Sequence, residues 1–202
     1  MKPFFYLLLL GSHLLSAEDL KWKQGSVVLA SGSVVAGQIS MTPGQNLILF
    51  KGIKINNEHA AGSTAGAESL PAHKLKAVFF YDDEANINRR FLAAGARKVF
   101  PGVQLYEVVL QGSIDVLRRP RTLSSNSAES KDFDYYCSDH NKLIPLWKFY
   151  RELYPAIEDR SRQQLLAFIK ANDLQHGDDA NLITIIGYYN KMARAEQALA
   201  RQ

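Results

Sequence analysis

The spacing of apolar residues changes once along this chain, and that change constrains the fold more than any other feature. Up to about Ser138, apolar residues occur in short runs such as "SVVLA", "SVVAGQIS" and "NLILFKG", separated by "SG" and "TPGQ". Runs of this kind are typical of short antiparallel strands joined by turns. After Asn141 the apolar residues recur every three to four positions, as in amphipathic helices. Strands followed by helices predict an α+β fold rather than an alternating α/β sheet.

The front part, residues 18–142, is predicted to be an antiparallel β meander, either a small barrel or a sandwich. The run "LKAVFFY" carries apolar residues on both faces, which favours a central strand. The stretch "VQLYEVVLQGSIDVLRR" predicts a hairpin in which Tyr106, Val108 and Leu110 alternate inward before the turn "QGS". Polar stretches near 57–72 and 120–131 predict flexible loops.

The rear part, residues 143–202, is predicted to form two or three helices that cover the sheet or follow it. Ser161 and Gln164 have the spacing of a capping box ahead of "LLAFIK". Asp179 is predicted to cap a last helix that begins with "NLITIIGYYN". The first predicted helix precedes these two, and its apolar residues have helical spacing; they are Leu146, Phe149, Tyr150 and Leu153.

The first 17 residues have the pattern of a secretory signal peptide. Lys2 precedes an apolar run over residues 4–10, and Ala17 is a small residue at the predicted cleavage site. The apolar run is too short to span a bilayer. The pattern predicts export to the periplasm or the extracellular space, with a position at the outer membrane as one option. An uncleaved N-terminal anchor is the alternative. No later stretch reaches membrane-spanning length, so we expect no transmembrane segment after signal removal.

Cysteine content and charge restrict the class of protein further. Cys137 is the single cysteine, so an intramolecular disulfide is impossible and the exported chain must depend on its apolar core. This favours a bacterial envelope over a small secreted disulfide scaffold. The chain has 24 Lys and Arg against 20 Asp and Glu. That small excess is compatible with anionic envelope partners and does not indicate nucleic-acid binding.

Four stretches resemble known sequences. "AHKLKAVFFYDDEANINRRF" with "LYEVVLQGSIDVLRR", and the tail "LLAFIKANDLQHGDDANLITIIGYYNK", resemble uncharacterised exported proteins of Bacteroidetes-type bacteria. The resemblance implies an envelope location and brings no activity or site residues. Separately, "VVLASGSVVAGQI" is similar to the opening hairpin of Sm-like or SH3-like small barrels.

Arginines at the predicted strand ends are the best candidates for a binding site. Arg89 and Arg90 begin one predicted strand. A second group ends another predicted strand and consists of Arg118, Arg119 and Arg121. If the strands are neighbours, several guanidinium groups could converge on a carboxylate or a phosphate. Consecutive residues of a strand face opposite sides of the sheet, so the two arginines of a doublet cannot both belong to one binding site. The alternative is a set of surface charges, with one arginine paired to an acid of the "DDE" run. The predicted anion-binding residues are Arg89, Arg118 and Arg121.

Other candidate sites lack the residues that their chemistry requires. The acids after Tyr81 have neither the glycine nor the final glutamate of a calcium loop, so they are interpreted as a hydrated hairpin turn that discourages edge pairing. Cys137 and His140 are too few ligands for structural zinc. No serine-hydrolase, metalloprotease or dinucleotide motif is present in the sequence. We therefore predict no catalytic residue, metal or cofactor.

Together these features predict a non-catalytic envelope protein that binds, or gives structural support to, a protein or an anionic glycan. The alternative is a periplasmic hydrolase whose carboxylates are brought together only by folding.

Overall fold

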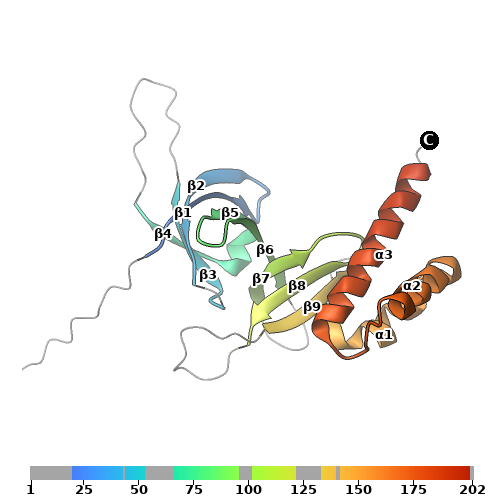
Figure 1. Cartoon of the computed structure of the whole chain (residues 1–202). Coiled ribbons are helices and arrows are strands. Elements are labelled where there is room, and N and C mark those ends of the chain that lie inside the picture. The colour runs from blue at the N-terminus through green and yellow to red at the C-terminus, as the bar shows by residue number, and fades with distance from the viewer. Residues whose placement is uncertain are drawn as a thin grey trace, which may run out of the picture.

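The computed structural model describes residues 20–42, 44–52, 66–95, 102–121, 133–139 and 142–200. Its strands form one antiparallel sheet in the order β10-β9-β8-β7-β6-β5-β1-β2-β3-β4, and the helices follow (Figure 1). The predicted α+β class is therefore confirmed. The strands are β1 (Lys23–Leu29), β2 (Val34–Ser40), β3 (Leu47–Gly52), β4 (Glu68–Pro71), β5 (Leu75–Asp82), β6 (Ile87–Gly95), β7 (Val103–Leu110), β8 (Asp115–Pro120), β9 (Phe133–Asp139) and β10 (Lys142–Pro145). The helices are α1 (Phe149–Glu152), α2 (Asp159–Ala171) and α3 (Asp179–Leu199), with short 3₁₀ turns η1 (Ala72–Lys74), η2 (Leu146–Lys148) and η3 (Tyr154–Ala156).

The N-terminal part of the sheet curls on itself (Figure 1). A Cβ atom placed on Gly44, in the β2–β3 turn, would lie 3.8 Å from Pro120 Cβ at the end of β8, although several strands separate them in the sheet. The curled strands enclose one apolar core. The result is a single open, curled sheet rather than a sandwich of two sheets. Its buried residues are Val27, Ile39, Ile48, Phe50, Leu70, Ala72, Leu75, Val78, Phe80, Phe91 and Leu105.

The helices pack on the other end of the sheet and build a second core. One face of β8, β9 and β10 supplies Val116, Cys137 and Ile144, and α3 covers them with Ile185 and Ile186. The helical segment thus covers the sheet rather than merely following it. Beyond Asn190 the residues of α3 are mostly exposed, and in Figure 1 this end of the helix projects past the sheet.

Asn190 connects α3 to the β7–β8 turn. Its side-chain amide donates to the Ile114 carbonyl at 2.8 Å, and its Oδ1 accepts from the Ile114 N–H at 2.9 Å. Asn190 is buried, so these bonds satisfy polar groups that water does not reach. A Cβ atom at Gly112 would overlap the Asn190 side chain, which explains glycine at this position.

The β7–β8 hairpin and the central position of β5 are confirmed. The prediction that β7 buries the one face of Tyr106, Val108 and Leu110 was incomplete. Tyr106 is fully buried in a small cluster with Leu117 and Tyr136, separate from the helix-covered core. Its ring meets that of Tyr136 edge-on at 5.4 Å between centroids. Val108 and Leu110 are only half-buried. Both faces of β7 therefore carry buried residues, because Leu105 belongs to the curled core.

Several predicted boundaries differ from the structure. Residues 68–71, inside the loop predicted near 57–72, form β4, which pairs with β3. The sheet continues through β10 to Pro145, so it crosses the predicted boundary at 142/143. Residues 57–65 and 122–131 of the two predicted loops lie outside the described residues, as does the predicted signal peptide.

The predicted helix caps were also displaced. No capping box forms: α2 begins before Ser161, whose buried hydroxyl lies 3.4 Å from a Glu196 oxygen of α3. The cap of α3 is Asp178, whose Oδ1 accepts from the Ala180 N–H at 2.7 Å, and Asp179 is the first helical residue. The expected first helix is a single turn, α1, between η2 and η3.

Candidate functional site

Strand alternation and register bring five charged side chains onto the concave face of the curled sheet. Phe80 pairs with Arg89, and Glu107 pairs with both Phe91 and Arg118. Residues that face each other across a ladder share one side of the sheet. Asp82, two residues beyond Phe80, joins this face. We call the resulting set the ion-pair chain; its members are Lys23, Asp82, Arg89, Glu107 and Arg118.

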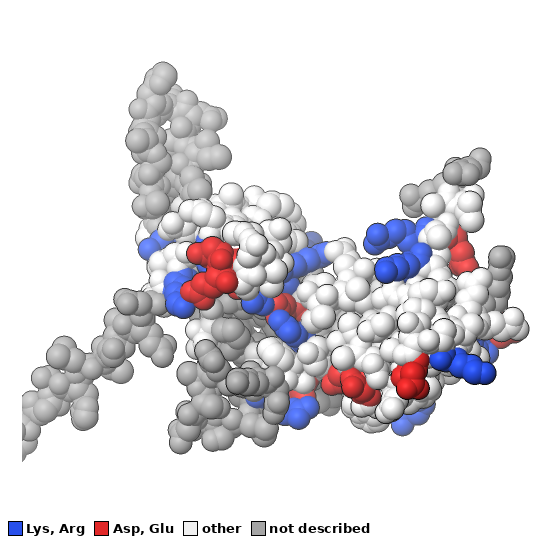
Figure 2. All heavy atoms as spheres, in the orientation of Figure 1, with Lys and Arg blue, Asp and Glu red and all other residues white. Residues whose placement is uncertain are grey.

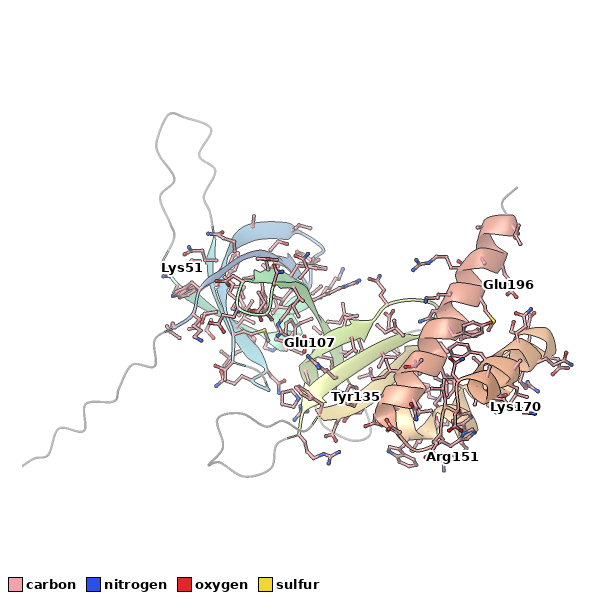
Figure 3. All side chains as sticks on the ribbon, viewed as in Figure 1. Lys51, Glu107, Tyr135, Arg151, Lys170 and Glu196 are labelled. Atoms are coloured by element: carbon pink, nitrogen blue, oxygen red, sulfur yellow. The ribbon has the colours of Figure 1, made fainter. Side chains whose placement is uncertain are left out.

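Each carboxylate of the ion-pair chain is held between two cations. Asp82 accepts from Lys23 and, at 2.6 Å, from Arg89 Nε. Glu107 accepts from an Arg89 terminal nitrogen at 2.5 Å and from Arg118 Nε at 2.7 Å. Arg89 therefore bridges the two acids, whereas Lys23 and Arg118 end the chain. Figure 3 labels Glu107 where the curled strands meet β8, and Figure 2 shows acidic and basic groups side by side in this part of the molecule.

The electrostatic balance of the ion-pair chain favours an additional anion. Three cations face two carboxylates, which leaves one positive charge. The hydrogen bond from Lys23, and then that from Arg89, lower the pKa of Asp82 to about 2 despite its burial. Burial opposes the charge of Arg89, but bonding to Asp82 and the charge of Glu107 raise its pKa above its usual value. Both carboxylates are thus committed to cations inside the protein.

The ion-pair chain lies in a cleft of about 610 Å³. Its apolar walls come from both ends of the curl, and its rim includes Lys21, which pairs with Glu84 at 2.7 Å. Arg118 also lies over the ring of Phe133, 4.4 Å from its centroid. The cleft thus combines a charged base with apolar walls, a common composition for ligand sites. The apolar lining residues are Leu20, Ile39, Met41, Phe80, Phe91, Leu105, Pro120 and Phe133.

The structure brings together two of the three predicted anion-binding arginines. Arg89 and Arg118 both bond Glu107 and both line the cleft. Arg121 instead pairs with Asp134 at 2.9 Å on the surface and is not among the lining residues. Arg90 points to the opposite face of the sheet, as expected for a doublet on a strand, and lies 5.4 Å from the ring of Phe79.

The interpretation of the acidic run as a hydrated turn was wrong for Asp82. Only 7% of this residue is exposed, and its carboxylate belongs to the ion-pair chain. The remainder of the turn fits the expectation of a hairpin: Asn86 has φ 55 and accepts from the Tyr81 hydroxyl. Across the described ranges, no three His, Cys, Asp or Glu side chains are close enough to hold a metal ion.

Lys23 and Glu107 were missed as site residues. Lys23 stands beside an apolar run without a distinguishing motif. Glu107 could have been found from the β7–β8 hairpin alone, because its register places Glu107 opposite Arg118. Residues 96–102 separate β6 from β7, so no tight two-residue turn fixes the register of these strands, and the addition of Arg89 could not be predicted in the same way.

Cys137 does not take part in the site. It is fully buried between β8 and the helices, and burial raises the pKa of its thiol to about 12. A thiol in this state is a poor nucleophile. Cys137 therefore acts as a small apolar residue of the helix-covered core.

We expect the ion-pair chain to make the free energy of unfolding fall at acidic pH. The pKa of Asp82 is lower in the folded protein than its ordinary value of 3.8, so its stabilisation is complete above pH 4 and is lost as the pH falls towards 2. Because water screens a group facing a cleft, we expect a loss of about 1–2 kcal/mol. Urea unfolding at pH 5 and pH 2.5 measures it. Asp82→Asn should lose less stability than the unchanged protein over this interval, and equal losses would contradict the assignment.

None of the helices in the described part of the chain is long and apolar enough to cross a bilayer. Comparisons of the chain with protein-family models, with curated proteins and with solved structures give no match.

Proposed function

We propose that this protein is a non-catalytic binding protein of the cell envelope, whose cleft receives a carboxylate next to an apolar group of a partner protein. The observation that carries the proposal is the ion-pair chain at the base of an apolar-walled cleft, with one cation in excess. Export rests on the signal-peptide pattern of residues 1–17. The absence of a disulfide framework supports a bacterial envelope as the location.

The chemistry of the two carboxylates supports binding over hydrolysis. A general acid or base works best with a pKa near the working pH. The pKa of Asp82 is far below neutrality, and both acids are already paired with cations. Such groups hold arginines in position rather than exchange protons with a substrate. The residues of the cleft thus favour a binding role over the hydrolase alternative.

The Arg118 end of the ion-pair chain is the place for the ligand carboxylate. Arg118 bonds Glu107 through its Nε and also interacts with the Tyr135 side chain, but an arginine has five N–H donors in one plane, so donors remain for a ligand. A second carboxylate beside Arg118 would restore charge balance and gain charge-assisted hydrogen bonds. The neighbouring rings of Phe133 and Phe91 would contact an apolar side chain. This pairing of charge and apolar surface fits a polypeptide end better than a polar glycan.

Nuclear magnetic resonance with a defined probe tests the proposal. The probe is the N-acetylated tripeptide Ala-Leu-Phe with a free C-terminal carboxylate, and its C-terminal amide is the matched control. We expect the acid to shift the amide signals of Phe80, Arg89 and Leu105, and the C-terminal amide to bind about tenfold more weakly. Shifts elsewhere only, or equal binding of both peptides, would contradict the proposed site.

A further inference from the structure

A second groove lies on the opposite, convex face of β1, β5 and β6. Its volume is about 520 Å³, and it is open to solvent along its length. Cross-strand pairing joins Ser26, Phe79 and Arg90 in one row and places Tyr81 opposite Asn88 in the next. We propose that this groove binds an acidic saccharide through its carboxylate. The lining residues are Gln24, Gly25, Ser26, Phe79, Phe80, Tyr81, Asn88, Arg89, Arg90 and Gln111.

Arg90 is the residue that indicates an anionic ligand. Its Nε is buried, and no hydrogen-bond partner for it exists among the residues that the structure describes. Buried polar groups are normally bonded, so this guanidinium is incompletely satisfied within the protein. Because its Nε is out of reach of solvent, a ligand in the groove would bond the other N–H donors of the same guanidinium. The residues that line the groove include no Asp or Glu, and the guanidinium rests on Phe79, 5.4 Å from the ring centroid. Because no carboxylate among the lining residues neutralises this fixed positive charge, an anionic ligand would form charge-assisted hydrogen bonds with it.

The remaining groups of the groove indicate a sugar rather than an apolar ligand. Gln24, Asn88 and Gln111 are exposed and offer side-chain amides, each of which both donates and accepts. Vicinal hydroxyls of a pyranose have the same dual character. Tyr81 is 45% exposed, and its hydroxyl donates to Asn86, which fixes the ring. An aromatic ring held at a polar surface offers its face to the C–H groups of a sugar ring.

The groove and the cleft lie on opposite faces of the sheet, and Phe80 and Arg89 are among the lining residues of both. The side chains of Arg89 and Arg90 nevertheless separate, as expected for consecutive residues of a strand: the Arg89 guanidinium bonds Asp82 and Glu107, whereas the Arg90 guanidinium lies over Phe79. The inference therefore goes beyond the proposed function: one protein would hold a partner polypeptide on the concave face and an acidic glycan on the convex face.

Binding of trigalacturonate, measured by calorimetry and by amide shifts, tests this inference. The fully methyl-esterified trisaccharide is the neutral control probe. We expect trigalacturonate to shift Gln24, Tyr81 and Asn88, and Arg90→Gln to weaken binding about tenfold. Tyr81→Ala should weaken binding about fivefold through the lost ring face. Lys170→Gln removes one positive charge from α2, which lies at the other end of the molecule from β1 and β5 (Figures 1 and 3), and should change affinity less than about twofold.

Several outcomes would overturn the inference. They are an absence of shifts in the groove at millimolar trigalacturonate, equal binding of the methyl ester, or full affinity in Arg90→Gln. Binding of the tripeptide acid here, in preference to the saccharide, would also overturn it. Circular dichroism of each variant separates loss of binding from loss of fold, and Tyr81→Ala keeps the test valid if Arg90→Gln unfolds.

Discussion

Asn190→Ala should lower the free energy of unfolding by about 2–4 kcal/mol, since it removes two buried hydrogen bonds and leaves two backbone groups unsatisfied. Those groups are the N–H and the carbonyl of Ile114, which α3 would still cover. Water cannot easily replace the lost amide, because the turn at Gly112 packs directly against this side chain. Urea unfolding followed by circular dichroism measures the change.

Lys191→Ala is the matched control for Asn190→Ala. It changes the next residue of α3, which is exposed, and should alter stability by less than about 0.5 kcal/mol. If Asn190→Ala were as mild as this control, the amide would not be the connection between α3 and the hairpin. Near-normal far-ultraviolet dichroism in both variants would show that the comparison concerns stability rather than misfolding.

Arg89→Met should lower the free energy of unfolding by about 2 kcal/mol. Arg89 bridges Asp82 and Glu107, so its loss leaves each carboxylate with a single cation in a partly buried position. Removing one partner of a fully buried pair costs more than this, and the access of water through the cleft reduces the effect. Methionine retains much of the apolar stem of arginine, so the change reports mainly on charge. Urea unfolding at pH 7 measures it.

Arg121→Met is the control for Arg89→Met. Arg121 and Asp134 are 50% and 42% exposed in their side chains, and exposed ion pairs contribute little. We expect a change below about 0.5 kcal/mol. Equal effects of the two substitutions would show that the ion-pair chain behaves as surface charge. This would also contradict the view that Arg89 organises the cleft.

The change of period in the sequence predicted the α+β fold because burial on one face imposes a period of two on strands and about 3.6 on helices. It could not predict the curl of the sheet. That curl depends on contacts between strands far apart in sequence, such as the approach of the Gly44 turn to Pro120. The predicted caps at Ser161 and Asp179 failed because several adjacent polar residues could serve. Ser161 lies inside α2, where its hydroxyl contacts Glu196 of α3, and Asp178 rather than Asp179 accepts from the first N–H groups of α3.

The candidate site was predictable in part. Alternation placed Arg89 and Arg90 on opposite faces, as the structure has them. The strands of Arg89 and Arg118 are not neighbours, because β7 lies between them, and the two arginines meet through Glu107 of β7. Arg121 follows the end of β8, pairs with Asp134 and is not among the residues that line the cleft. Lys23 and Asp82 could not be paired from the sequence, since β1 and β5 meet only in the folded sheet. The Lys23–Asp82 pair, at one end of the ion-pair chain, thus required the three-dimensional structure.

A comparison of two peptides on three proteins tests carboxylate binding in the cleft most directly. Calorimetry would measure the acetylated Ala-Leu-Phe acid and its C-terminal amide on the unchanged protein, on Arg118→Gln and on Arg121→Gln. We predict a preference of about tenfold for the acid, lost in Arg118→Gln and kept in Arg121→Gln. If Arg118→Gln kept the full preference for the acid, or if the unchanged protein showed none, Arg118 would not receive the ligand carboxylate.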